Sequence, residues 1–454
     1  MEYNISELLE KGGRIHFVGI GGSGMFPIVQ ILHAQGHDIS GSDVNEGSII
    51  DMERKMGIDV HIGHDPKNVE GASMLVVTAA LFSDNPEVLR ANELGIPVIP
   101  RADMFGYITT LYNNSLCVSG THGKTTTTCL LTSILLQANK DPSALIGGKL
   151  PLINGYGRVG ETENFVCEAC EFKDTFLHLS PAYSIILNID DDHMDYFGTL
   201  ENAKHSFLEF ADKASKAVIA NLDDDNTVSA LSDCKTTIIY FGENAKSNYR
   251  ISNVSIYEKA FYEFDITHND NHLGTFRLKV PGRHNVWNAT AAIAAAFESG
   301  CDITSIQEGI SSFSGAGRRF EFLGSFNGVT VADDYAHHPT ELTATLKAAK
   351  NMGYNRVIAV FQPFTYSRTY MLLDDFVEAL KIADVVVMTE IMGSREKNTY
   401  NIYTSDLAAK IPGSVWFNTF EEVVDHIKQI AVSGDLVLTL GCGDIYKAAH
   451  MLLK

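Results

Sequence analysis

The chain has 454 residues, of which 45% are hydrophobic and 20% charged, so it is long and apolar enough to form several globular domains. A formal net charge of −21 argues against nucleic acid or an anionic membrane as a partner. The lack of a long apolar run predicts no membrane insertion, and the seven cysteines, three of them inside apolar elements, favour a reducing cytoplasm.

The first 112 residues are predicted to form a Rossmann-like domain. A strand over Arg14–Val18 precedes Gly19-Ile20-Gly21-Gly22-Ser23-Gly24, which matches the G-x-G-x-x-G pattern, and a helix follows. A second strand ends at Asp43, about twenty residues beyond the glycines. Such glycines let the backbone approach a diphosphate, and the carboxylate can bind ribose hydroxyls. The pattern is typical of a dinucleotide site, and a UDP-linked sugar offers the same groups.

A phosphate-binding loop is predicted after the next strand, Ser115 to Val118, and before a buried helix. The N–H groups of a helix N-terminus can bind an anion, Lys124 adds a positive charge for the β- and γ-phosphates, and the Thr125 hydroxyl can bind Mg²⁺. Only two residues separate the two glycines, rather than the four of a Walker loop. The predicted ATP-binding residues of the loop are Gly120, Thr121, His122, Gly123, Lys124, Thr125 and Thr126.

The second domain, residues 113–314, alternates strands and helices, which predicts a parallel sheet covered by helices. One strand ends at Glu168, and another runs into the segment that contains His193. Since ligands collect at the carboxyl ends of parallel strands, both side chains should lie beside the phosphate loop. Short strands between about 249 and 280 predict a small antiparallel insertion. A glycine-rich hinge then leads into a third α/β domain, residues 315–454.

Six motifs in this order resemble the Mur ligase family, and the resemblance covers essentially the whole chain. They are Gly-Ile-Gly-Gly-Ser-Gly-Met (19–25), Gly-Thr-His-Gly-Lys-Thr-Thr-Thr (120–127), Asn-Ile-Asp-Asp-Asp-His-Met-Asp (188–195), Gly-Arg-His-Asn (282–285), Asp-Asp-Tyr-Ala-His-His-Pro (333–339) and Gly-Cys-Gly-Asp-Ile (441–445). The resemblance implies an α/β fold of three domains: a Rossmann-like UDP-sugar domain, a P-loop ATPase-like central domain and a Rossmann-like amino-acid domain.

The resemblance also implies an activity. It is the ATP-dependent joining of L-alanine to the lactyl carboxylate of UDP-N-acetylmuramate through an acyl phosphate, with ATP and Mg²⁺ required. A cytoplasmic enzyme of peptidoglycan precursor synthesis is therefore expected, with a role in cell wall biogenesis, cell shape and cell division. Its assembly is left open as a monomer or a homodimer.

Roles follow from the resemblance residue by residue. Lys124, Glu168, His193 and Arg368 are expected to be catalytic, with Thr125 and Glu168 on one Mg²⁺ and His193 on a second. The remaining expected contacts are Gly21, Gly22, Ser23, Gly24 and Asp43 for the UDP-sugar, His284, Asn285, Asn288 and Asp334 for ATP, and Tyr335 and His337 for the amino acid. The planar guanidinium of Arg368 matches the carboxylate of L-alanine in bidentate geometry.

Two positions depart from the pattern of many relatives. Cys170 lies in Glu168-Ala169-Cys170-Glu171-Phe172-Lys173, where relatives carry Glu-Ala-Asp-Glu-Ser-Asp, and Phe364 replaces a histidine. Lys204 lies where sister ligases carbamylate a lysine, so a modified lysine and an ordinary surface lysine both stay open.

Three other functions remain open at this point. A related recycling ligase attaches a whole peptide to the same sugar nucleotide. An NAD-dependent oxidoreductase fused to an ATPase would also explain the first glycine motif. A non-catalytic nucleotide-binding switch would need the phosphate loop but not Glu168 and His193.

Overall fold

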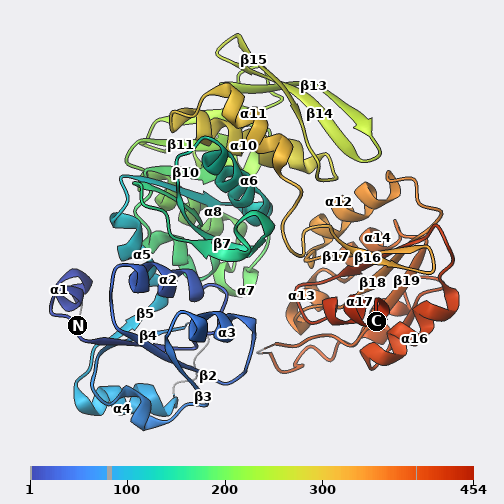
Figure 1. The fold of residues 1–454 in the computed structure, drawn as a ribbon. Coiled ribbons are helices and arrows are strands. Elements are labelled where there is room, and N and C mark those ends of the chain that lie inside the picture. Colours follow the sequence, from blue (N-terminus) through green and yellow to red (C-terminus); the bar gives the residue numbers. More distant parts are fainter. Residues whose placement is uncertain (1–2, 79–83, 395) are drawn as a thin grey trace. The chain divides into compact units, whose positions relative to one another are not determined.

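The computed structural model describes residues 3–78, 84–394 and 396–454, and Figure 1 shows its elements. The chain folds into two compact units. The first unit comprises Met1–Asp190, Tyr196–Phe241 and Ala291–Gly309, and the second comprises Asp191–Asp195, Gly242–Thr290 and Ile310–Lys454. Over the described ranges, every helix is too short or too polar to serve as a membrane span.

The first unit begins with a five-stranded parallel sheet in the order β3-β2-β1-β4-β5. Its strands are β1 (Arg14–Val18), β2 (Ile39–Asp43), β3 (Asp59–Ile62), β4 (Ala72–Val77) and β5 (Val98–Pro100). Its helices are α1 (Ile5–Glu10), α2 (Phe26–Ala34), α3 (Ser48–Lys55), η1 (Pro66–Val69), α4 (Pro86–Leu94) and α5 (Arg101–Thr110). Parallel strands place all their carboxyl ends at one edge, so the glycine loop after β1, Asp43 and the start of α5 share that edge.

The second sheet of the first unit has parallel strands in the order β12-β11-β10-β6-β9-β7, with β8 antiparallel to β7. Its strands are β6 (Asn114–Ser119), β7 (Ser143–Leu150), β8 (Gly155–Arg158), β9 (Asn164–Glu168), β10 (Tyr183–Ile186), β11 (Ala217–Asn221) and β12 (Ile238–Gly242). The helices between β6 and β12 are α6 (Lys124–Gln137), η2 (Pro151–Ile153), η3 (Phe172–His178), α7 (Met194–Phe197), α8 (Leu200–Asp212) and α9 (Asp225–Ala230). Two more helices, α10 (His284–Glu298) and α11 (Ile303–Ser312), follow later in the chain. Because β6 lies between β9 and β10, the loop that follows β6 is flanked by the ends of both neighbours.

One apolar core joins the two sheets of the first unit. The Phe105 ring of α5 meets the Phe165 ring of β9 edge-on at 6.3 Å, and Tyr112 stacks on Phe165 at 4.8 Å. Gly106 lets α5 approach closely, because a Cβ there would lie 2.2 Å from the His178 carbonyl oxygen. Aromatic packing and close backbone approach therefore fix the two sheets against each other.

The second unit contains an antiparallel insertion and a third sheet. The insertion consists of β13 (Tyr249–Glu258), β14 (Phe261–His268) and β15 (Asn271–Arg277). The third sheet has the order β16-β17-β21-β18-β19-β20, with β16 antiparallel to β17 and the other pairs parallel. Its strands are β16 (Glu321–Phe326), β17 (Val329–Asp334), β18 (Val357–Phe361), β19 (Val385–Thr389), β20 (Val415–Phe417) and β21 (Leu436–Leu440).

Helices cover both faces of the third sheet. They are α12 (Pro339–Lys350), α13 (Tyr366–Met371), α14 (Leu373–Leu380), α15 (Thr404–Ala408), α16 (Phe420–Ile430) and α17 (Tyr446–Leu452). Successive strand residues point to opposite faces. Ala332 accordingly belongs to a core with Leu342 of α12, whereas its neighbour Val331 belongs to a separate core with Ile427 of α16.

The predicted α/β class is confirmed, with three mainly parallel sheets and an antiparallel insertion that comes after β12 and before β16 along the chain. The predicted domain boundaries after residues 112 and 314 stay predictions.

Candidate active site

The turn between β6 and α6 has the backbone that an anion-binding loop requires. Gly120 and Gly123 have φ values of 138° and 88°, a region that L side chains rarely adopt. A Cβ on Gly120 would also meet the Asn188 backbone at 3.2 Å. The N-cap residue of α6 is Gly123, which has no side chain to cap the helix, and the N–H groups of a helix N-terminus can bind an anion.

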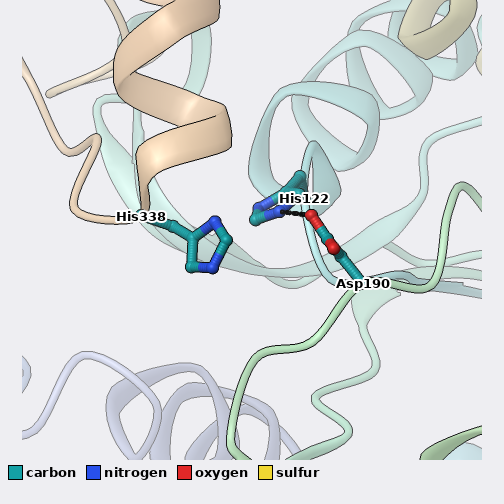
Figure 2. A group of neighbouring side chains, drawn as sticks. All are labelled: His122, Asp190 and His338. Carbon is teal, nitrogen blue, oxygen red and sulfur yellow. Dashed lines mark hydrogen bonds and ion pairs between the residues drawn. The ribbon is translucent and has the colours of Figure 1, made fainter. Parts of the chain in front are cut away.

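The segment after β10 holds this loop in place. Asn188 accepts the Thr121 N–H on its main-chain oxygen at 3.0 Å and the His122 N–H on Oδ1 at 2.8 Å. The Asp190 N–H donates to Thr121 Oγ1 at 2.9 Å, and Asp190 Oδ2 lies 3.1 Å from His122 Nε2 (Figure 2). The predicted residues Thr121 and His122 therefore fix the loop to the neighbouring strand end. His338, also drawn in Figure 2, belongs to the second unit.

Lys124 is the first residue of α6, and oxygen atoms of the first unit surround its ammonium group. Nζ donates to the carbonyl oxygens of Gly120 at 2.5 Å and Thr121 at 3.1 Å, and to the Glu171 carboxylate oxygens at 3.0 and 2.9 Å. Burial lowers the pKa of Lys124, but the Glu171 carboxylate outweighs that effect and leaves the pKa raised. Glu171, itself only 3% exposed, thus takes the counter-ion position that the sequence assigns to a phosphate.

Thr125 and Glu168, predicted to share a Mg²⁺, lie together in the first unit. Thr125 Oγ1 donates to Glu168 Oε2 at 3.1 Å, and the Gly147 N–H donates to Oε1 at 2.6 Å. Gly147 leaves room for this carboxylate, because a Cβ there would lie 2.7 Å from Glu168 Oε2 in its present position. A hydroxyl and a carboxylate are oxygen donors of the kind that Mg²⁺ prefers, so these residues fit such an ion.

The glycine loop after β1 contacts Asp43. The Gly21 N–H donates to Asp43 Oδ2 at 3.0 Å, and Gly22 and Ser23 are exposed. The predicted UDP-sugar residues therefore form a continuous group at the carboxyl edge of the first sheet.

In the second unit, Arg368 forms an ion pair that sequence analysis missed. Its Nη2 donates to Asp192 Oδ1 at 2.7 Å, with the two side chains 12% and 9% exposed. Asp374, a surface carboxylate that follows Arg368 in the sequence, accepts a hydrogen bond from Lys410 instead. Burial raises the pKa of Asp192, but Arg368, together with His193 and His337, outweighs that effect and holds this pKa well below its usual range.

Tyr335 and His337 also lie close together in the second unit. Their rings meet edge-on at 5.6 Å, and His337 Nδ1 lies 3.1 Å from the Tyr335 carbonyl oxygen and 3.3 Å from a Glu341 carboxylate oxygen. Burial lowers the pKa of His337 to about 4, so the ring is neutral at pH 7. Because Nδ1 faces two acceptors, it carries the proton and Nε2 is the basic nitrogen.

The other predicted ATP contacts make hydrogen bonds within their own segments. Asp334 accepts the Phe320 and Ala336 N–H groups at 2.7 and 2.8 Å, and burial raises its pKa to about 6. Asn285 Nδ2 donates to the Pro281 carbonyl oxygen at 2.7 Å, and Asn288 Nδ2 donates to Asn285 Oδ1 at 2.9 Å. His284 is the first residue of α10. Their roles toward adenine and ribose stay predictions.

The structure also describes His193, which is predicted to bind Mg²⁺, and Lys204, for which a modification was left open. His193, in the second unit, has a φ of 57°, and its N–H donates to Asp192 Oδ1 at 2.8 Å. Lys204 Nζ pairs with Glu201 at 2.9 Å on α8, the arrangement of an ordinary helix lysine. Metal binding by His193 and modification of Lys204 stay predictions.

Three family models match the chain: Mur ligase family catalytic domain over residues 14–113, Mur ligase middle domain over 118–296 and Mur ligase glutamate ligase domain over 318–443. The UDP-N-acetylmuramate–L-alanine ligase of Caldanaerobacter subterraneus is 42% identical over 452 residues, which is 98% of each chain. The chain belongs to the Mur ligase family. The resemblance predicted from six motifs is therefore confirmed.

Other similarities of this Mur ligase span nearly the same length. The UDP-N-acetylmuramate–L-alanine ligase of Acetivibrio thermocellus is 43% identical over 451 residues, 98% of this chain and 96% of that one. The crystal structure of UDP-N-acetylmuramate-alanine ligase from Thermotoga maritima has a TM-score of 0.83 and 29% identity, covering 97% of this chain and 98% of that one. A murein peptide ligase from Psychrobacter arcticus has a TM-score of 0.75 and 25% identity, with the same coverage.

The Lys124–Glu171 pair predicts that Glu171→Gln tightens MgATP binding. A nucleotide phosphate must compete with the Glu171 carboxylate for the Lys124 ammonium. Replacing a charge-assisted hydrogen bond by a neutral one weakens the competitor by about 1 kcal/mol, so the Kd for MgATP should fall about fivefold in calorimetric titration.

Glu163→Gln is the matched control, because it removes the same charge from an exposed carboxylate that accepts a hydrogen bond from Asn113 Nδ2. Unchanged MgATP binding by Glu171→Gln would show that Glu171 stays paired with Lys124 when the nucleotide binds. Weaker binding would show that Glu171 itself helps to bind the nucleotide.

Proposed function

We propose that this Mur ligase joins L-alanine to the lactyl carboxylate of UDP-N-acetylmuramate, coupled to cleavage of ATP to ADP and phosphate. The observation that carries the proposal is the 42% identity to a UDP-N-acetylmuramate–L-alanine ligase over 98% of both chains. The protein would require Mg²⁺ and act in the cytoplasm on peptidoglycan precursors, as a monomer or a homodimer.

The chemistry of the proposed reaction explains the residues of the first unit. A carboxylate is a poor acyl donor, so it first attacks the γ-phosphate of ATP and becomes an acyl phosphate. This transfer requires in-line positioning and neutralisation of charge on the phosphate oxygens. Lys124 and the N–H groups of α6 supply positive charge where β6 ends. Mg²⁺ held by Thr125 and Glu168, with a second ion at His193, would neutralise further phosphate charge.

The second step explains the residues of the second unit. The amine of L-alanine attacks the acyl carbonyl, and phosphate leaves. Arg368 would bind the alanine carboxylate with the donors that Asp192 leaves available, since a guanidinium has five N–H groups. The neutral His337 ring avoids repelling the incoming ammonium, and its basic Nε2 can accept a hydrogen bond from it.

The runner-up is the recycling reaction, which attaches a murein peptide to the same sugar nucleotide. It is favoured by the similarity to the murein peptide ligase of Psychrobacter arcticus, at 25% identity. Four relatives that are 40–43% identical are each named as UDP-N-acetylmuramate–L-alanine ligases, which supports the first proposal.

Phosphate release with UDP-N-acetylmuramate, MgATP and different acceptors tests the proposal. L-alanine should be the best acceptor, with glycine and L-serine slower but active, because one methyl or hydroxyl group gives only modest discrimination. Lys124→Ala should lower kcat about 100-fold or more with an unchanged circular dichroism spectrum. Faster release with a murein tripeptide than with L-alanine would establish the recycling reaction, and no release with any acceptor would exclude a ligase.

Arg368→Lys should raise the KM for L-alanine about tenfold or more, a loss of roughly 1.4 kcal/mol. Lysine keeps the charge next to Asp192 but cannot bind a carboxylate through two parallel N–H groups. The KM for ATP should change little in the same steady-state measurements.

Arg356→Lys provides the control, because Arg356 makes two hydrogen bonds to Asp435 in the same unit and is assigned no substrate. An unchanged KM for L-alanine, or an equal rise for ATP, would identify Arg368 as a structural residue.

A further inference from the structure

Arg101 is a cation at the carboxyl edge of the first sheet to which no substrate group has been assigned. It is the first residue of α5 and directly follows β5. The glycine loop after β1 and Asp43 at the end of β2 lie at the same edge. The Arg101 side chain is half-buried.

The other arginines of the first unit bind oxygen atoms of the protein. Arg14 binds Ser40 and the Glu70 carbonyl, Arg54 binds Glu46, Arg90 binds Glu93 and Arg158 binds Asp141. Arg101 alone among the five makes no hydrogen bond or ion pair with any residue of the ranges 3–78, 84–394 and 396–454.

Leaving this guanidinium without a counter-ion is costly. Burial lowers the pKa of Arg101, which shows that its charge is partly removed from water. An arginine nevertheless stays protonated in proteins, so the charge is retained. A half-buried charge is stabilised by a partner of opposite sign, and an anion from outside the described residues would supply one for Arg101.

The surroundings of Arg101 indicate where the partner lies. A Cβ on Gly24 would be 3.3 Å from Arg101 Nη1, so the missing side chain of Gly24 lets the guanidinium lie against the glycine loop. Burial raises the pKa of the Cys170 thiol to about 11, and Lys124 and Arg101 both act to lower this pKa, so both cations lie near Cys170. Lys124 already has Glu171 as its counter-ion. Among the residues that the structure describes, Arg101 therefore offers a positive charge with no hydrogen-bonded or ion-paired partner, beside the glycine loop and near Cys170.

We propose that Arg101 binds an anionic oxygen group of the sugar nucleotide, either its diphosphate or its lactyl carboxylate. This inference rests on the proposed function. The diphosphate is expected at Gly21 to Gly24, and the lactyl carboxylate has to reach the γ-phosphate near Lys124, so the sugar nucleotide must span the region that Arg101 occupies. A guanidinium binds phosphate and carboxylate oxygens equally well in bidentate geometry.

Calorimetric titration of the full chain tests the proposal, with UDP-N-acetylmuramate and UDP-N-acetylglucosamine as ligands. The second ligand has the diphosphate but lacks the lactyl carboxylate. Arg101→Gln should raise the Kd for UDP-N-acetylmuramate at least tenfold, and Arg101→Lys should restore part of the affinity. Arg90→Gln is the control, because Arg90 is also half-buried but pairs with Glu93 on α4. Its Kd values should equal those of the wild type.

The two ligands distinguish the two anionic groups. An equal loss of affinity for both ligands assigns Arg101 to the diphosphate, and a loss confined to UDP-N-acetylmuramate assigns it to the lactyl carboxylate. Unchanged Kd values for both would overturn the proposal. If Arg101→Gln does not fold, Arg101→Lys tests the proposal in its place. Its Kd for UDP-N-acetylmuramate should rise at least threefold, and an unchanged Kd would overturn the proposal. A wild-type protein that binds neither ligand contradicts the proposed function instead.

Discussion

The ammonium group of Lys124 and the Glu171 carboxylate form the ion pair on which the candidate active site depends. The loop carbonyls of Gly120 and Thr121 and both Glu171 oxygens fix the ammonium at the N-terminus of α6. A charged amine beside a helix N-terminus would otherwise be unfavourable, because both are positive. Glu171 compensates this repulsion and keeps the ammonium charged and oriented. A phosphate that enters the loop therefore meets donors that are already in place, but it has to displace or share an internal anion.

The sheet topology explains why residues far apart in sequence meet at this ion pair. In the first unit, β6 has β9 on one side and β10 on the other, so the phosphate loop, Glu168 and Asn188 all follow the carboxyl ends of adjacent strands. Glycines then allow the closest approaches: Gly147 admits the Glu168 carboxylate, and Gly120 admits the Asn188 backbone. The order of the strands therefore brings the predicted functional residues together, and the conformations of the loops set the distances between their side chains.

Much of this arrangement could be predicted from the sequence. The sequence correctly predicted that Gly120 to Thr125, Glu168 and Asp43 lie at or directly after the carboxyl ends of strands. Short apolar strands that are followed by glycines or acidic residues are strong local patterns. Partners at long range could not be predicted in this way. Asp192 pairs with Arg368 across 176 positions, and Glu171 reaches Lys124 from a turn that has no regular periodicity. Arg101 could have been found, since it directly follows the β5 strand at the same sheet edge as the glycine loop.

The central claim is that the lactyl carboxylate is activated by phosphoryl transfer at Lys124 before the amine attacks. Isotope transfer tests it most directly: UDP-N-acetylmuramate labelled with ¹⁸O in both lactyl carboxylate oxygens is converted with L-alanine and MgATP, and the released phosphate is analysed by mass spectrometry. An acyl phosphate predicts that each phosphate carries one ¹⁸O atom, because the attacking carboxylate oxygen leaves with phosphorus. Phosphate without label, alongside formation of the amide, would contradict the account.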